Sequence, residues 1–244
     1  MHLAETTWTD ADATETDLAV LPVGSTEQHG PHAPLGTDYL TAEHVASEGA
    51  AHCEKDVVVG PPVPVGVSEE HRQFTGTLWV SPDTFRSYVR ETVESLLSHG
   101  WDRVVIVNGH GGNTAAIREI ASELTRRFRA VVAPYTWFDA VDVDLDMGHA
   151  GAVETSLLLR TYPELLHEGR FEAAAADGAQ RWGDWVSGVN LSPDTASFTD
   201  NGAVGDPTEA STESGAALET QAVDALATLL EAVSRRSLET PPHK

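Results

Sequence analysis

Short apolar runs alternate along this chain with longer segments whose apolar residues recur at helical spacing. Residues 18–23, 103–107 and 130–134 are short and largely apolar, as is typical of strands buried on both faces of a sheet. Residues 57–67 are also apolar but contain three prolines, which predicts a strand that turns into a loop. Residues 41–53, 151–161 and 208–234 predict helices.

Two further helices are predicted from their apolar stripes. The first begins at Ser81-Pro82, a capping serine followed by proline at the first helical position, and ends before Gly100. Its stripe consists of Phe85, Tyr88, Val89, Thr92, Val93, Leu96 and Leu97. The second follows residue 113, and the residues expected to face inward are Ile117, Ile120, Ala121, Leu124 and Phe128.

This alternation of strands and helices predicts an α/β protein with a mostly parallel sheet covered on both faces, as one domain over residues 1–244. Polar residues 25–38 and 108–113 each directly follow a predicted strand. Because ligands of such sheets bind at the carboxyl ends of the strands, both clusters are expected at one edge. Residues 177–207, rich in Gly, Asp and Ser, predict an irregular active-site or interface loop.

The charge of the chain is strongly negative. Thirty-eight acids face fifteen bases, the formal net charge is −23, and Lys55 and Lys244 are the only lysines. A field of this sign repels nucleic acid and anionic membranes, so neither is an expected partner. Molar salt shortens the Debye length to about 3 Å and screens the self-repulsion. The composition therefore indicates a salt-loving host, with an acidic protein of an ordinary host as the alternative.

Several other classes of protein have no support in the sequence. It contains no run of eighteen apolar residues, and its acidic first seventeen residues do not resemble a secretory signal, so a cytoplasmic location is expected. The single cysteine, Cys53, excludes an intrachain disulfide or cysteine zinc cluster and is expected in the core. No serine lies in a GxSxG elbow, which disfavours nucleophilic serine catalysis.

Carboxylate and imidazole side chains gather in residues 24–38. Glu27 and His29 are two positions apart and point the same way in extended chain, while glycines and prolines allow Asp38 to return to the same place. Such ligands suit zinc, manganese or ferrous iron, and a carboxylate can bridge two ions. The alternative is a polar loop whose histidine hydrogen-bonds to backbone.

Two further clusters carry candidate chemistry. In residues 108–113 (NGHGGN), His110 lies between glycines that let backbone approach a ligand. A phosphate cradle is the alternative there, although the GxGxxG fingerprint and a Walker lysine are missing. In residues 148–156, His149 and Glu154 are candidates for a proton relay or a further ligand, against a capping histidine and a surface glutamate. The other helical histidines are interpreted as structural or exposed: His44, His52, His99 and His167.

With these clusters the chain resembles the creatininase (creatinine amidohydrolase) family. The matching stretches are GSTEQHGPHAPLGTD, EEHRQFTGTLWVSPDTF, VIVNGHGGN, GHAGAVETS and GAVGDPTEAS. The resemblance implies a three-layer α/β/α fold, a homo-oligomer that is usually a hexamer, a small-molecule substrate and two divalent ions per chain, variously manganese, zinc or iron.

The resemblance also implies roles for individual residues. Glu27 and His110 hold one ion, His29 holds the other, and Asp38 bridges them. His149 matches a histidine that shuttles protons. The residues expected at the substrate are His71, Asn108 and Gly109.

One position departs from the family pattern. Creatininases that act on creatinine carry a glutamate ligand two residues after the histidine of the NGH motif, where this chain has Gly112. Glu154 is therefore the expected replacement ligand, and creatinine or a related cyclic amide becomes the alternative substrate.

Another branch of the family deformylates a ring-opened pyrimidine nucleotide on the archaeal route to riboflavin and deazaflavin cofactors. The salt-adapted composition favours that branch, and Arg72 is a candidate phosphate contact. The expected function is thus metal-dependent hydrolysis of a non-peptide C–N bond, with this deformylation as the first hypothesis. A non-catalytic phosphate- or metal-binding module is the alternative of another class.

Overall fold

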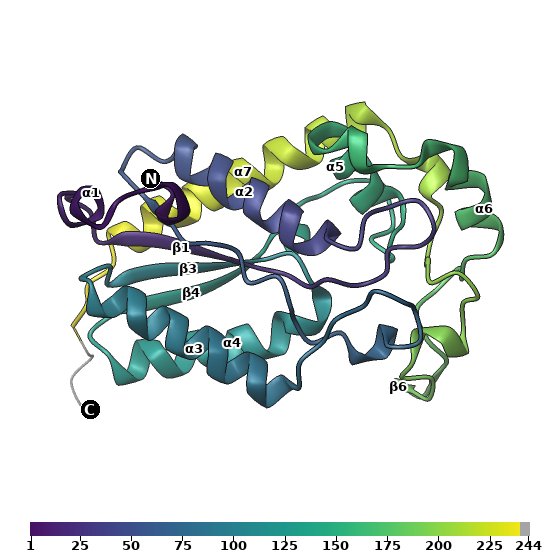
Figure 1. Cartoon of the computed structure of the whole chain (residues 1–244), viewed down its shortest axis with the longest axis horizontal. Helices are drawn as coiled ribbons and strands as arrows, with labels where there is room; N and C mark the ends of the chain where they lie inside the picture. Colours follow the sequence, from purple (N-terminus) through teal and green to yellow (C-terminus); the bar gives the residue numbers. More distant parts are fainter. Residues whose placement is uncertain (240–244) are drawn as a thin grey trace.

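The computed structural model describes residues 1–239. Its centre is a parallel sheet with the strand order β2-β1-β3-β4 (Figure 1). The strands are β1 (Leu18–Val23), β2 (Val58–Val59), β3 (Arg103–Asn108) and β4 (Val131–Thr136). This sheet confirms the predicted α/β class. β2 is much shorter than the apolar run 57–67, because the prolines that follow it cannot donate to a strand ladder.

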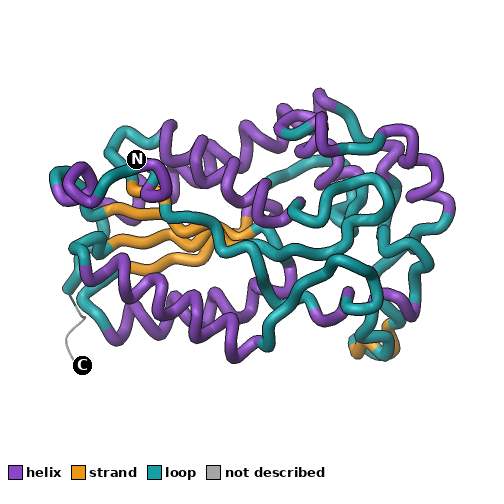
Figure 2. Tube along the Cα trace, in the orientation of Figure 1, coloured by secondary structure: helices purple, strands orange, loops and turns teal. Residues whose placement is uncertain are grey.

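Helices cover both faces of the sheet, as the sequence predicts (Figure 1). One layer contains α2 (Thr37–His52), α5 (Ala152–Thr161) and α7 (Thr212–Ser234). The other contains α3 (Pro82–Ser98) and α4 (Thr114–Arg127). Figure 2 shows the strands between these layers and the long loops gathered beyond one end of the sheet. Two short helices lie outside the layers, α1 (Trp8–Asp12) and α6 (Phe171–Ala176).

The two faces of the sheet build separate apolar clusters. Along β1, Leu18 and Val20 pack on the side of α2 and α7, whereas Ala19 and Leu21 pack on the side of α3 and α4. All four side chains are buried, as the alternation of a strand covered on both faces requires.

Two side chains expected in the stripe of α3 are not buried. The helix begins as predicted, because the hydroxyl of Ser81 accepts a hydrogen bond from the amide of Thr84 at 3.2 Å, a cap worth about 1 kcal/mol. Phe85 and its neighbours along the centre of the stripe are buried, but Tyr88 is exposed and Thr92 is half-buried. Both lie on the flank of the stripe opposite Arg86 and Arg90, the side chains that pair with acids of α4.

Other boundaries also differ from the prediction. Phe128 is exposed rather than inward, because α4 ends at Arg127. Cys53 is half-buried at the end of α2 and is not a core residue. α2 begins four residues earlier than expected, and this extension places Asp38 in its first turn.

Residues 177–207 are largely irregular, as predicted, but contain a small hairpin. Its strands are β5 (Trp185–Val186) and β6 (Val189–Asn190), and it projects from the lower edge of the molecule in Figure 1. The helix that follows begins only at Thr212, after a 3-10 turn at Pro207–Glu209.

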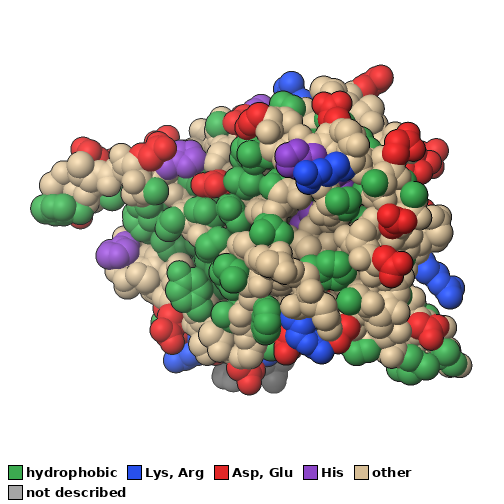
Figure 3. Space-filling view, turned by 45° about the vertical axis from the view of Figure 1, so that its right-hand side comes forward, with side chains coloured by type: hydrophobic (Ala, Val, Ile, Leu, Met, Phe, Trp, Pro, Cys, Tyr) green, Lys and Arg blue, Asp and Glu red, His purple; other side chains and the backbone are tan. Residues whose placement is uncertain are grey.

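Large hydrophobic side chains are exposed in several places on the surface. Leu78, Trp79 and Tyr88 are 54%, 41% and 57% exposed. Figure 3 shows hydrophobic side chains gathered over one face, with acidic side chains mostly toward its margins. Within the described part of the chain, no helix is both long enough and apolar enough to cross a bilayer.

Candidate active site

The carboxyl ends of β1 and β3 lie side by side, as the sequence analysis expects. The parallel register pairs Val23 with Asn108, so the loops that follow both strands leave the sheet at the same edge. They border a cavity of ≈ 340 Å³. The lining includes the predicted site residues Glu27, Asp38, His71, His110, His149 and Glu154.

Asp38 lies between two imidazoles. Its Oδ1 is 3.0 Å from His29 Nε2, and its Oδ2 is 3.1 Å from His110 Nδ1. Glu27 Oε1 is 3.2 Å from the same nitrogen of His110. All four side chains are at most 5% exposed. The two polar clusters therefore converge on one buried group of acids and imidazoles.

Backbone carbonyls fix the orientation of both imidazoles. His29 Nδ1–H donates to the carbonyl of Glu27 at 3.1 Å, and His110 Nε2–H donates to the carbonyl of Val67 at 2.6 Å. The other nitrogen of each ring then faces carboxylate oxygens about 3 Å away. This contact is favourable only when a proton or a metal cation lies between the nitrogen and the carboxylate.

The electrostatics of the group also call for a cation. Burial alone lowers the pKa of His29 and of His110, but the surrounding carboxylates outweigh it and hold each pKa well above its ordinary value. Among the described residues, both carboxylate oxygens of Glu27, His29 Nε2 and Asp38 Oδ2 are buried without a hydrogen-bond partner. Buried carboxylates and imidazoles without hydrogen-bond partners are suitable ligands for divalent first-row metal ions.

Glu154 completes a second group of ligands. Its Oε1 is 3.7 Å from His29 Nε2, and its Oε2 accepts a hydrogen bond from the amide of Ala150 at 2.6 Å. The side chain is 5% exposed, so it is not a surface glutamate. Its donor atoms lie within reach of those of His29 and His149. Glu154 therefore lies beside His29 in the site, and its role as the replacement for the acid missing at Gly112 stays a prediction.

His149 faces the same group from the loop before α5. Its backbone exchanges two hydrogen bonds with Val204, at 2.9 and 2.8 Å. Gly148 before it has φ +56°, and a Cβ there would lie 2.1 Å from the Val204 carbonyl oxygen, so only glycine fits. His149 Nε2–H donates to the carbonyl of Gln28 at 2.7 Å, and its Nδ1 is 3.8 Å from Glu27 Oε1. Burial and the charge of His29 lower the pKa of His149 to about 4.

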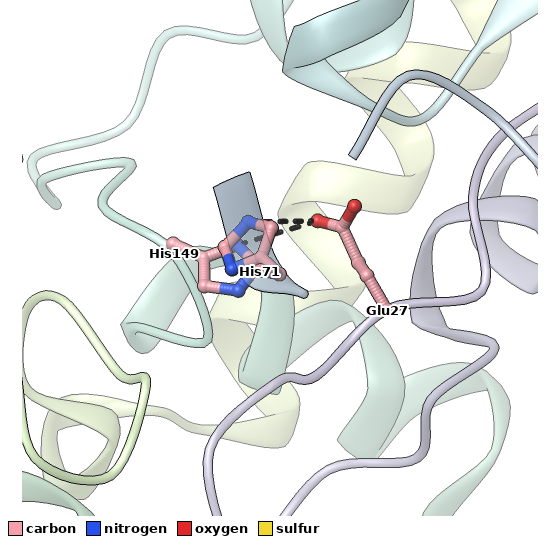
Figure 4. A group of neighbouring side chains, drawn as sticks. All are labelled: Glu27, His71 and His149. Carbon is pink, nitrogen blue, oxygen red and sulfur yellow. Dashed lines mark ion pairs between the residues drawn. The ribbon is translucent and has the colours of Figure 1, made fainter. Parts of the chain in front are cut away.

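His71 stacks on His149. Their ring centres are 4.5 Å apart, and Figure 4 shows both rings directed at the carboxylate of Glu27. His71 Nε2 is 3.5 Å from Glu27 Oε1. On its other side, Nδ1 accepts a hydrogen bond from the amide of Gln28 at 2.8 Å. Burial and the neighbouring His149 lower the pKa of His71, so the neutral ring directs Nε2–H towards Glu27.

Asn108 and Gly109 lie beneath the cavity and do not line it. The side chain of Asn108 donates to the carbonyl of His110 at 2.7 Å and accepts from its amide at 3.1 Å, which clamps the turn that carries this histidine. A Cβ at Gly109 would lie 2.1 Å from the carbonyl oxygen of Asp38. Direct contact of either residue with a substrate stays a prediction, and their positions favour a supporting role.

Arg72 does not face the cavity. Both of its terminal nitrogens donate to the carboxylate of Asp194, each at 2.6 Å. The predicted phosphate contact of this arginine therefore has no support from its position.

Three residues of the site have no place in the sequence-based hypothesis. Gln28 is 4% exposed and connects His71 with the backbone of Gly202. Its position between Glu27 and His29 in the sequence could have indicated that it belongs to the site. The other two line the cavity, Glu70 and Trp182. Nothing in the composition of the loop 177–207 distinguishes Trp182 from the other tryptophans.

The parallel sheet and its buried acids and imidazoles fit a metal-dependent enzyme, and the family that the sequence matches makes it a hydrolase that acts on carbon–nitrogen bonds. The sequence matches the creatininase family (creatinine amidohydrolase) over residues 4–230, and the chain belongs to this family.

Relatives support this membership across most of the chain. The mycofactocin precursor peptide peptidase of Mycobacterium ulcerans is 34% identical over 230 residues, which cover 91% of this chain and 85% of that protein. The creatinine amidohydrolase of Pseudomonas putida is 29% identical over 193 residues, covering 68% of this chain and 74% of that protein.

Solved structures confirm the fold. A crystal structure of creatinine amidohydrolase (creatininase) has a TM-score of 0.78 at 25% identity and covers 97% of this chain and 98% of that one. A structure described as creatininase with Mn has a TM-score of 0.81 at 24% identity, with 96% and 99% covered.

Proposed function

We propose that this chain hydrolyses an amide C–N bond with water activated by two divalent metal ions. Glu27, Asp38 and His110 would hold one ion. His29 and Glu154 would hold the other and share Asp38. The observation that carries this proposal is the position of the two Asp38 oxygens, 3.0 and 3.1 Å from the imidazole nitrogens of His29 and His110 that do not bond to backbone carbonyls, where a metal ion can replace the proton between each nitrogen and the carboxylate. A creatininase structure of Zn–Zn type supports a pair of ions in a relative.

The bound ions would lower the pKa of water towards about 7 and polarise the amide carbonyl. The residues of the chain would move the proton. His149 is neutral, its Nε2–H is held by the carbonyl of Gln28, and its Nδ1 faces Glu27 in the cavity. It is therefore placed to accept a proton from the attacking water and to deliver it to the leaving nitrogen. His71 would orient Glu27 from the other side.

The cavity favours a substrate without a phosphate group. Among residues 1–239, no lysine or arginine lines it, and Arg72 pairs with Asp194. Deformylation of the pyrimidine nucleotide, the first hypothesis from the sequence, thereby loses the phosphate contact that supported it. The peptidase of M. ulcerans makes a short peptide or peptide-like amide the first substrate to test, ahead of creatinine.

A panel of amides tests the proposed function. The protein is loaded with Mn²⁺, Zn²⁺ or Fe²⁺ in molar KCl and incubated with short peptides, creatinine and the formylated pyrimidine nucleotide. We expect two ions per chain by elemental analysis and release of an amine from at least one amide. Two bound ions without hydrolysis of any amide would instead support a metal-binding module, and tight nucleotide binding without metal would support a phosphate-binding module.

A homo-oligomer is also part of the proposal. The exposed hydrophobic side chains Leu78, Trp79 and Tyr88 on an otherwise acidic protein support an interface between copies. Light scattering after size-exclusion chromatography would give the mass of the assembly and test the hexamer that the family resemblance implies.

A further inference from the structure

The cavity contains a carboxylate that the proposed metal centre does not use. Glu70 lies on the 3-10 turn Glu69–His71, and its half-buried side chain lines the cavity. It belongs to none of the described groups of three side chains whose donor atoms lie within 4.8 Å of one another. The three acids of those groups are Glu27, Asp38 and Glu154.

Gly112 leaves open the space beside this carboxylate. A Cβ at position 112 would lie 3.3 Å from Glu70 Oε1, and it would also approach the carbonyl oxygen of Val67 to 2.2 Å. A larger residue at 112 therefore does not fit this backbone. The glycine keeps the carboxylate of Glu70 accessible from the cavity.

The carboxylate of Glu70 faces its own backbone amide but has no side-chain partner. Within residues 1–239, its oxygens form no salt bridge, and no side chain donates a hydrogen bond to them. The nearest cation in the sequence, Arg72, is held by Asp194 at 2.6 Å. No lysine or arginine lines the cavity, and the only counter-charge that the described residues bring near Glu70 is the imidazole of His110, which the proposed centre assigns to a metal ion. A partly buried carboxylate without a side-chain partner is costly, so a ligand that brings a cation or an N–H donor is favoured at this position.

Another part of the cavity wall is apolar, and this restricts the ligand further. Phe138, Met147 and Trp182 line the same cavity. The ring of Trp182 lies 5.7 Å from that of His71, the residue that follows Glu70 in the chain. A substrate in this cavity therefore meets an apolar wall beside a single free carboxylate.

We propose that Glu70 determines the specificity of the site by binding a protonated amine of the substrate, whose apolar part packs against Trp182. This inference rests on the proposed function and gives it a substrate class: amides that carry a cationic amine and an apolar group.

Amine binding tests this inference without relying on catalysis. The probes are phenethylamine, which is cationic, and 2-phenylethanol, which has nearly the same shape without the charge. Calorimetric titration of the metal-loaded protein should show phenethylamine binding on the order of tenfold more tightly, as expected for a charge-assisted hydrogen bond. Glu70→Gln should remove most of this difference, and Glu70→Asp should retain part of it. Equal binding of the two probes by the unaltered protein would overturn the inference.

Glu69→Gln is the matched control, because it removes the same charge from an exposed side chain one residue away. It should leave the preference for phenethylamine unchanged, and an equal loss in both variants would show that general surface charge is responsible. The amide panel adds a second readout. Glu70→Gln should raise KM for a peptide with a free amino group and leave KM for its N-acetyl analogue unchanged.

The two proposals can fail separately. If the amine preference depends on Glu70 but no amide is hydrolysed, the hydrolase proposal fails and the binding assignment stands. If amides are hydrolysed without any preference for an amine, the assignment of Glu70 is wrong and the hydrolase proposal stands.

Discussion

Asp38 and His110 meet in the cavity from different parts of the chain, with Asp38 Oδ2 3.1 Å from His110 Nδ1. The aspartate comes from the first turn of α2, and the histidine follows the end of β3. Because the other oxygen of Asp38 faces His29 at 3.0 Å, one side chain serves both halves of the proposed metal centre.

The first prediction concerns the loss of this bridge. Asp38→Asn keeps the shape of the side chain but removes its charge and one acceptor oxygen. We expect the metal content, measured by elemental analysis after dialysis, to fall from two ions per chain to fewer than one, with loss of hydrolysis. Asp83→Asn, which removes an acid that is 97% exposed, should keep both ions. Two tightly held ions in the Asp38 variant would contradict a bridging role.

The second prediction concerns the pH dependence of the gain in stability on metal binding. In the metal-free protein, burial raises the pKa of Glu27 to about 7, and the acids hold the pKa of His29 and of His110 well above its ordinary value. Groups whose folded pKa is raised stabilise the fold at low pH and lose this contribution as the pH rises through that pKa. Metal ions replace those protons, so the gain in stability should be larger at pH 8.5 than at pH 6.

Thermal denaturation with and without Mn²⁺ or Zn²⁺ at these two pH values measures this gain. Asp38 and Glu154 do not reverse the sign, because their pKa values are lowered and their contribution is lost only under more acidic conditions. A shift in Tm that is the same at both pH values would count against the assigned ligands.

The third prediction concerns His149. The proposed centre assigns His149 to proton transfer and not to an ion, although its donor atoms lie within 4.8 Å of those of His29 and Glu154. His149→Ala should therefore retain metal while kcat falls by about 10²- to 10⁴-fold. The change is measured by elemental analysis together with steady-state kinetics. His99→Ala, at the exposed end of α3, is the control for removal of a histidine. Full activity in the His149 variant would exclude it as the proton carrier.

The sequence predicts the convergence of the site well because its main ligands follow strands. Glu27 and His29 come directly after β1, and His110 directly after β3, so the parallel pairing of these strands brings the ligands together. The i, i+2 spacing also brings Glu27 and His29 to the two sides of Asp38, where they are proposed to hold different ions. The position of Asp38 depends in addition on where α2 begins, and the apolar pattern did not indicate this earlier start.

The remaining parts of the site depend on contacts that no local pattern encodes. Trp182 reaches the cavity from an irregular loop, and Glu70 becomes significant only because Gly112 leaves room and Arg72 turns to Asp194. The same reason explains the error at Phe128, whose exposure depends on where α4 ends and not on its spacing.

The fourth prediction tests the support beneath the site with two neighbouring glycines. A Cβ at Gly109 would lie 2.1 Å from the backbone oxygen of Asp38, whereas a Cβ at Gly111 would meet nothing within 4 Å. Gly109→Ala should therefore displace Asp38 and lower metal affinity, and Gly111→Ala should retain both ions. Equilibrium dialysis against a graded series of Zn²⁺ concentrations distinguishes the two variants. Equal affinities would indicate that the backbone relaxes around the methyl group.

The fifth prediction concerns the excess of negative charge. With a net charge of −23, repulsion between acids exceeds the attraction within surface pairs such as Arg90 with Glu123, which are 2.9 Å apart. Salt screens both the repulsion and the attraction, and the larger repulsive contribution falls more. Tm should therefore rise between 0.15 and 2 M KCl. Over this range the Debye length shortens from about 8 Å to below about 3 Å.

Variants with fewer acids separate charge screening from other effects of salt. Glu54 and Glu91 are exposed and form no salt bridge within the described residues. Changing both to Gln should raise Tm at 0.15 M KCl and reduce its increase with salt, because less repulsion remains to be screened. If Tm of the unaltered protein stays constant or falls with KCl, self-repulsion does not limit its stability. If Tm rises equally in the double variant, the gain comes from an effect of salt other than screening, and the interpretation of the acidic composition as an adaptation to salt loses its physical basis.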